Sequence, residues 1–152
     1  MTRLVTLVAL SFAMAIAPAS GEEKSKRIHV TAEIVEQTFT GNLADPEIGD
    51  KLILRADLFD KNDKKVGIGA GVCTIVSVPE PREIENTLLQ CLNSAVFDQG
   101  QIVFGGSAPF PNVGVVARFG ILGGTGEFSK ARGEATLVVI SPTLQEATFD
   151  LE

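Results

Sequence analysis

Hydrophobic and polar residues alternate along several stretches of the chain, which is the pattern of β-strands with one buried face. In the stretch 28–39, Ile28, Val30 and Ile34 share one face, while Glu33 lies on the other. The same alternation recurs at intervals along the rest of the chain. We expect eight strands, at 28–39, 51–60, 66–78, 84–93, 99–104, 113–121, 131–140 and 144–151.

The residues between these strands are typical of turns. Asp60-Lys61-Asn62-Asp63, Gly123-Gly124-Thr125-Gly126 and Ser141-Pro142 each separate two alternating stretches. No stretch sustains a helical period, although 84–91 could form a short helix in isolation. Many strands with short turns predict an all-β fold, either an antiparallel sandwich or a barrel. Eight antiparallel strands would close a barrel just wide enough for side chains or one small ligand.

The first 21 residues resemble a secretory signal peptide. Arg3 precedes an almost wholly apolar run, and small residues follow it up to Gly21. We expect cleavage after Ala19 or after Gly21, with an uncleaved anchor as the alternative reading. The remaining residues, 22–152, would form a single domain. The protein would then be secreted or periplasmic, with no stable membrane insertion after signal cleavage.

Composition narrows the choice of function. The 152 residues carry a formal net charge of −6, which argues against nucleic-acid binding because such proteins present basic patches. One His and two Cys cannot build a four-ligand zinc site without carboxylates, so we expect no metal and no other cofactor. His29 is alone, and a structural, hydrogen-bonded role is the simpler interpretation.

The two cysteines flank a predicted hairpin. If this hairpin centres on Arg82, Cys73 faces Cys91 across the strand pair. Directly opposed residues are close enough for a disulfide, and an oxidising compartment favours one. We therefore expect a Cys73–Cys91 bond, with two buried thiols or one reactive thiol as alternatives.

Two loop motifs have more than one interpretation. Gly123-Gly124-Thr125-Gly126 lacks the Lys-Ser/Thr ending of a phosphate-binding loop and leads into another strand. The run that begins at Asp60 has Lys64 at the fifth position of a calcium loop, where an oxygen ligand is needed. Both motifs are better explained as hairpin turns.

Longer motifs resemble the allene oxide cyclase and dirigent protein barrels. The run 64–73 is similar to plant allene oxide cyclase, and 123–128 with 131–133 is similar to a hairpin that both groups share. Shorter matches lie at 49–52, 58–60 and 98–102. The resemblance covers the chain from about Ile28 to its end. It implies a small eight-stranded antiparallel β-barrel with an apolar lumen, often trimeric.

The resemblance also implies an activity. Members of this family close rings or steer couplings by holding a flexible apolar molecule in one reactive shape, which needs few chemical groups. We therefore expect an exported barrel that binds an apolar small molecule and steers its cyclisation or isomerisation. Two alternatives remain open, a non-catalytic carrier of a hydrophobic ligand and a structural barrel filled by its own side chains.

The resemblance assigns individual site residues. Glu33 matches a lumenal glutamate, which implies a catalytic acid or base. Cys73 matches a lumenal cysteine, and two phenylalanines are further candidates for the lumen. The expected ligand-binding residues are Val35, Leu54, Ala56, Phe59, Cys73 and Phe104.

Strand periodicity and the resemblance disagree about Glu33. An inward Glu33 would turn Ile28, Val30 and Ile34 towards water, so periodicity alone places Glu33 outside. A covering neighbour would relieve this conflict, because both faces of the strand would then be buried. The apolar face of the first strand thus favours a homo-trimer.

Overall fold

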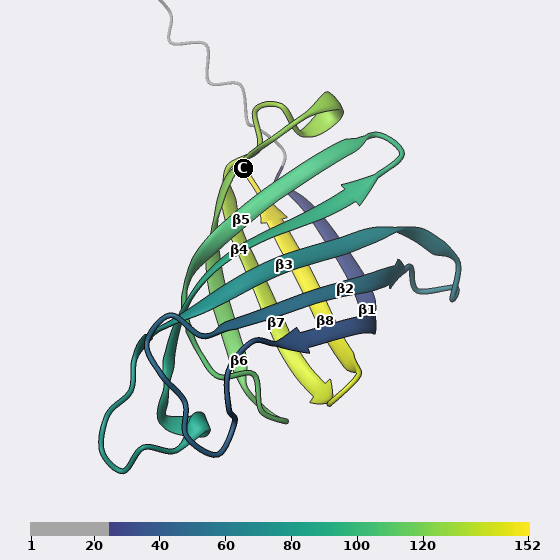
Figure 1. The fold of residues 1–152 in the computed structure, drawn as a ribbon. Helices are drawn as coiled ribbons and strands as arrows, with labels where there is room; N and C mark the ends of the chain where they lie inside the picture. The colour runs from purple at the N-terminus through teal and green to yellow at the C-terminus, as the bar shows by residue number, and fades with distance from the viewer. Residues whose placement is uncertain (1–24) are drawn as a thin grey trace, which may run out of the picture.

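The computed structural model describes residues 25–152, and the predicted signal peptide lies outside the described residues. Eight strands form one closed barrel, in which each strand pairs antiparallel with its sequence neighbours and β8 closes on β1 (Figure 1). This confirms the predicted all-β barrel. The strands are β1 (Lys26–Phe39), β2 (Lys51–Phe59), β3 (Lys65–Ser77), β4 (Leu88–Phe97), β5 (Gly100–Pro109), β6 (Val116–Gly124), β7 (Gly133–Ser141) and β8 (Leu144–Leu151).

Within residues 25–152, helical structure is confined to two short 3₁₀ turns, η1 (Ile84–Asn86) and η2 (Gly126–Phe128). In the part of the chain that the structure describes, no helix has the length and apolar character needed to cross a membrane. The predicted strand 84–93 is therefore wrong at its start. Thr87 explains the shift, because its buried hydroxyl donates to the Ile84 carbonyl at 2.7 Å and holds the 3₁₀ turn before β4 begins.

One end of the barrel is filled by aromatic rings, and we call it the aromatic end. Phe149 is 1% exposed, and its ring centre lies 5.3 Å from that of Phe104 and 6.4 Å from that of Phe97. Phe128, from η2, and Phe119, from β6, extend this cluster. Rings at these separations pack favourably beyond the area that they bury, so this end anchors the fold.

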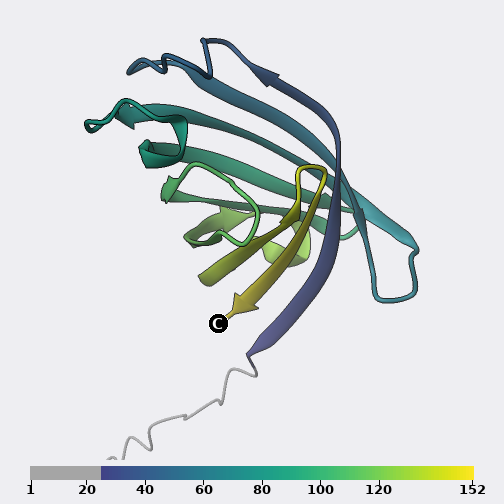
Figure 2. The same cartoon turned by 90° about the horizontal axis from the view of Figure 1, so that it is seen from below.

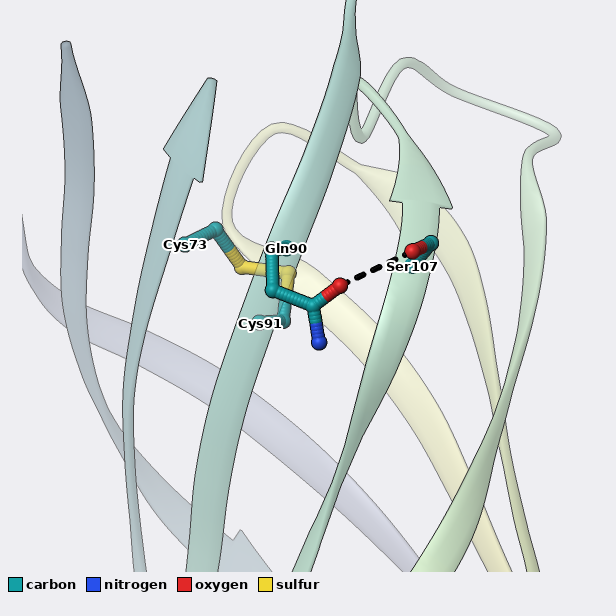
Figure 3. Close-up of a disulfide and its surroundings, with 4 residues drawn as sticks. All are labelled: Cys73, Gln90, Cys91 and Ser107. Carbon is teal, nitrogen blue, oxygen red and sulfur yellow. Dashed lines mark hydrogen bonds between the residues drawn. A yellow bond between two sulfur atoms is a disulfide. The ribbon is translucent and has the colours of Figure 1, made fainter. Parts of the chain in front are cut away.

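The disulfide joins β3 to β4 as predicted. Cys73 lies directly opposite Cys91 in the strand register, and the two sulfurs are bonded (Figure 3). The neighbouring Gln90 points to the other side of β4, where its amide oxygen accepts a hydrogen bond from Ser107 on β5 at 2.9 Å. Thus the covalent link crosses the inner face of the barrel wall and the Gln90–Ser107 pair lies on the outer face.

A bulge in β1 changes which residues face inward. From Ile28 to Ile34 the even-numbered residues face the core, but the pairing with β2 shifts between Ile34 and Glu36. Beyond the bulge, Gln37 and Phe39 face inward. A bulge also bends its strand, and Figure 2 shows β1 curving around the side of the barrel.

The Asp60 motif serves as a turn, as predicted. The prediction for the glycine-rich motif is wrong at its start, because Gly123 and Gly124 pair with β5 as the end of β6, and the connection to β7 runs through η2. The Asp60 carboxylate accepts hydrogen bonds from the backbone N–H groups of Asn62 and Lys64, which closes the β2–β3 turn. These bonds hold the pKa of Asp60 below its usual value because they favour the ionised form. Gly126 has φ of 59°, a left-handed conformation that suits glycine, and it begins η2.

The barrel wall is incomplete between β5 and β6. Their register runs from Ile102 opposite Gly124 to Gly105 opposite Gly120 and then ends, although β5 continues to Pro109. The loop 110–115 joins β5 to β6 at this end, and its Gly114 N–H donates to the Val139 carbonyl at 2.8 Å, which continues the pairing with β7. The strands thus separate at the end opposite the aromatic rings, which we call the mouth end.

Candidate functional site

Three cavities lie along the lumen, from the mouth end towards the aromatic end, and share parts of their walls. The outermost has a volume of about 230 Å³ and lies between Gln37, Val113 and Pro142. Phe39 and Phe110 meet near it edge to face, with ring centres 6.4 Å apart. We call this cavity the outer chamber; strand ends and the 110–115 loop form its walls.

Two smaller chambers lie deeper in the lumen. The first, of about 60 Å³, is bordered by the Cys73–Cys91 disulfide and by Phe119. The second, of about 40 Å³, reaches the rings of Phe104 and Phe149 at the aromatic end. These two inner chambers have four wall residues in common, Leu54, Asn93, Leu137 and Gln145.

The inner chambers have apolar walls interrupted by two amides. Asn93 projects inward from β4 and Gln145 from β8, and both border the two chambers. Because β4 and β8 are four strands apart in a closed barrel of eight, these amides come from opposite walls. Unlike Gln90, neither forms a side-chain hydrogen bond within the described part of the chain, and both residues are half-buried, so their amides still reach solvent.

Gly71 on β3 leaves room for the Asn93 amide. Gly71 is paired with Asn93, and a Cβ atom placed on Gly71 would lie 2.0 Å from the Asn93 amide oxygen. At Gly69 the same addition would make only ordinary contacts with Leu58 and Ala56. The Asn93 side chain therefore lies over β3 because position 71 carries no side chain.

Four of the predicted ligand-binding residues border the chambers. Leu54 borders all three, and Ala56 and Phe104 border the second. Cys73 borders the first as part of its disulfide, so it has no free thiol there. These residues come from β2, β3 and β5, whose alternation places them on the inner face.

Three predicted site residues lie elsewhere. Glu33 is exposed on the outer face of β1, so its expected lumenal position is wrong. Val35 is 43% exposed and lies in the bulge, where the inward phase of β1 is interrupted. Phe59 follows a register shift at the end of β2 and is half-buried away from the chambers. The apolar residues Val30 and Ala32 occupy the inward positions of β1 instead.

The sequence did carry a signal for the two amides. Asn93 occupies the inward phase of β4 between Cys91 and Ala95, and Gln145 occupies the inward phase of β8 before Ala147. An amide in an otherwise apolar series marks a polar group directed into the core. The resemblance drew attention to β1 and β2, so these positions on β4 and β8 were missed.

Ion pairs lie on the outer surface. Arg55 contacts Glu36 at 3.3 Å and Asp57 at 3.4 Å, and Lys65 reaches Asp57 at 2.8 Å. The Arg27 guanidinium hydrogen-bonds Asp150, which raises the pKa of Arg27. These exposed groups support neighbouring strands and do not border the chambers.

His29 has the structural environment expected of it, with Nδ1 3.0 Å from the Thr148 hydroxyl on the adjacent strand. Across residues 25–152, no group of three or more His, Cys, Asp or Glu side chains lies close enough together to hold a metal ion.

Comparisons with known proteins agree with this architecture. The family model of the allene oxide cyclase barrel-like domain matches residues 26–149. A search of curated proteins gave no match.

Solved structures share the barrel. A pyocyanin demethylase has a TM-score of 0.70 and 21% identity over 84% of this chain and 100% of its own. The exo-specific intermolecular Diels–Alderase AbnU has a TM-score of 0.65 and 23% identity over 83% of this chain and 98% of its own. A heme-binding cyclase that catalyses [4 + 2] cycloaddition in neoabyssomicin biosynthesis has a TM-score of 0.68 and 19% identity. The match covers 88% of this chain and 66% of the cyclase chain. At these identities the likeness shows the fold alone.

Proposed function

The chain belongs to the allene oxide cyclase barrel-like family, and from that premise we propose that it binds an apolar small molecule in its lumen and steers the cyclisation or isomerisation of that molecule. The observation that carries this proposal is the set of chambers at the mouth end, whose walls are apolar apart from a few amides. Ligand sites are typically apolar cavities with a small number of polar groups that fix orientation.

The solved relatives support a cyclisation chemistry. AbnU is described as an intermolecular Diels–Alderase and the heme-binding protein as a cyclase that catalyses [4 + 2] cycloaddition, and both reactions form a ring. Such a reaction is accelerated when the reacting groups are held near their reacting geometry. A narrow lumen of fixed shape supplies that constraint through packing alone, so the proposal does not depend on Glu33, whose outer position gives it no contact with the chambers.

Export is a second part of the proposal. We propose that the chain acts in the periplasm or outside the cell, as its N-terminal sequence predicts. The Cys73–Cys91 disulfide supports this because such bonds persist in oxidising compartments and are rare in the cytosol.

Native mass spectrometry of protein purified from the exported fraction tests the proposal. We expect a retained small molecule, or one taken up from a panel of neutral polyunsaturated compounds, at one per chain. Ala117→Phe fills the first chamber and is expected to abolish uptake, whereas Thr38→Phe places the same ring outside the lumen and should not. If wild-type protein takes up nothing and both variants behave alike, the barrel is structural. Stoichiometric uptake without any product identifies a carrier.

Self-association is a further part of the proposal, but β1 does not provide the contact surface that its sequence suggested. The structure turns Ile28, Val30 and Ala32 inward, so the face expected to contact a neighbour is core. Exposed apolar side chains lie instead on the outer face of β3 and β4, where Val72 is paired with Leu92. We propose that this face packs against further copies of the chain in a homo-trimer.

Light scattering after size exclusion tests the assembly. We expect the mass of a trimer for the wild type and of a monomer for Leu92→Arg, because a charge on the centre of an apolar interface is unpaired when buried. A monomeric wild type at concentrations of tens of micromolar would refute it.

A further inference from the structure

Two amide side chains border the inner chambers, and they indicate which polar group the ligand carries. The proposal rests on the function proposed above, and it starts from the amides of Asn93 and Gln145. Both side chains border the same two chambers and come from opposite walls. Each amide offers two N–H donors and one acceptor oxygen.

The hydrogen-bonding groups of these amides are not used by the protein itself. Gln90, on the outer face of β4, is bonded to Ser107, but the two inner amides have no such bond in the described chain. Both residues are half-buried, and no buried side-chain nitrogen or oxygen of the described chain lacks a partner, so the inner amides still reach solvent and can bind a ligand. Apolar residues fill most other inward positions of β4 and β8, among them Leu89 and Phe149.

The position of Asn93 is set by its neighbour. Its amide lies against Gly71, where any side chain would overlap it. The absence of a side chain at position 71 lets the amide lie on the lumen side of β3 and β4, where it borders both inner chambers.

The walls of the three chambers also disfavour a charged ligand. None of the residues that border the three chambers in the described chain is ionisable at neutral pH, since the disulfide removes both thiols. A carboxylate brought into such a wall would have no cation beside it, and burying an unpaired charge is strongly unfavourable.

We propose that the lumen takes an uncharged apolar molecule with a carbonyl group at mid-length, and that Asn93 and Gln145 bind this carbonyl oxygen. The oxygen has two lone pairs, so one donor from each wall can satisfy it. Such bonds draw electron density from a conjugated carbonyl and would orient the two apolar arms of the molecule into the two inner chambers.

The test uses three matched probes and the full-length mature protein. Benzalacetone is a neutral enone, 1-phenyl-1-butene replaces its carbonyl by a methylene, and cinnamate replaces its acetyl group by a carboxylate. Affinities are measured by titration calorimetry, and the carbonyl stretch of bound benzalacetone is measured by difference infrared spectroscopy. We expect a lowered stretch in the wild type, as hydrogen bonding to a carbonyl requires, and no detectable binding of cinnamate.

Near-isosteric variants separate the amides from the volume of the site. Asn93→Leu and Gln145→Met should each weaken benzalacetone binding about tenfold, the loss of one hydrogen bond, and leave 1-phenyl-1-butene unchanged or tighter. Gln90→Met removes an amide from the outer face of the same strand and should change neither affinity. Gly71→Ala, which displaces the Asn93 amide, should resemble Asn93→Leu.

The outcomes distinguish the two proposals. If the hydrocarbon binds in the lumen and the variants do not discriminate it from the ketone, the carbonyl assignment is overturned while the proposed function stands. Cinnamate binding as tight as benzalacetone also overturns the assignment. If neither neutral probe binds to the wild type, the proposed function itself fails. Should Asn93→Leu not fold, Gln145→Met and the infrared shift decide the question.

Discussion

At the aromatic end five phenylalanine rings fill the barrel, whereas at the mouth end smaller side chains leave three chambers. Phe149 is almost completely buried against Phe97 and Phe104, while Leu54 and Leu137 at the mouth end are only half-buried. The same closed sheet forms both ends. The difference therefore comes from side-chain volume and from the separation of β5 and β6, and it teaches that one end supplies stability while the other supplies space.

The largest expected effect is at the aromatic end. Phe149→Ala removes a ring that contacts two others and leaves a cavity in a close-packed region. We expect the free energy of unfolding to fall by about 3–5 kcal/mol, the usual cost of truncating a buried phenylalanine. Urea denaturation followed by circular dichroism measures it. A loss below about 1 kcal/mol would mean that this end is not the anchor of the fold.

The disulfide is expected to come next. Replacing Cys73 and Cys91 together by Ala removes a cross-link between residues 18 apart in sequence. The chain-entropy estimate for a loop of this size is about 3 kcal/mol. Denaturation of the double variant beside reduced wild type gives the measurement, and similar midpoints for both are expected. An unchanged midpoint in the double variant would argue against a formed bond in solution.

A leucine at the mouth end should matter less than a ring at the aromatic end. Leu137 already borders empty space, so Leu137→Ala loses fewer contacts than truncation in a filled core. We expect a loss of about 1–2 kcal/mol, in proportion to the smaller apolar area that is exposed. The same urea titration provides the comparison. A cost equal to that of Phe149→Ala would remove the distinction between the two ends.

The inner amides should have little effect on stability. Gln145→Met replaces a half-buried lumenal amide by an apolar side chain of similar shape. We expect the free energy of unfolding to change by less than about 1 kcal/mol, because the substitution breaks no side-chain hydrogen bond of the described chain. A stability loss above 1 kcal/mol in thermal unfolding would show that Gln145 has a structural role.

The smallest effect is expected outside both ends, at the β2–β3 turn. The pKa of Asp60 is lowered by backbone hydrogen bonds, so its contribution is present above the pKa of the unfolded chain and is lost as pH falls through the lower folded value. Asp60→Asn should reduce stability slightly at pH 7 and not at pH 2. Unfolding midpoints of both proteins at the two pH values test this, and an equal difference at both would contradict it.

The fold was predictable from the sequence because strand alternation and turn residues are local signals. Eight strands were placed along the chain, and symmetry about Arg82 gave the opposition of Cys73 and Cys91. The start of β4 was misplaced because a 3₁₀ turn at Ile84 precedes it. This turn is held by a hydrogen bond from the buried Thr87 hydroxyl, and the pattern of apolar residues gives no sign of such a bond.

The site was predictable only in part. Alternation correctly placed Leu54 and Ala56 inside, and it also indicated an outer position for Glu33, against the resemblance. Residue matching failed at Val35 because the bulge in β1 alters the inward phase, and bulges have no reliable sequence signature. The chambers depend on how β5 and β6 separate, which is a property of the whole closed sheet.

Methyl-resolved NMR during titration with benzalacetone identifies the part of the barrel that binds the ligand. We expect saturable shifts for methyl groups of Leu54, Leu137 and Val139 around the chambers, and little change for Ile102 and Leu151 at the aromatic end. Shifts that do not saturate, or that appear only on outer-face residues such as Leu92, would contradict the claim that the mouth end of this barrel is a ligand site.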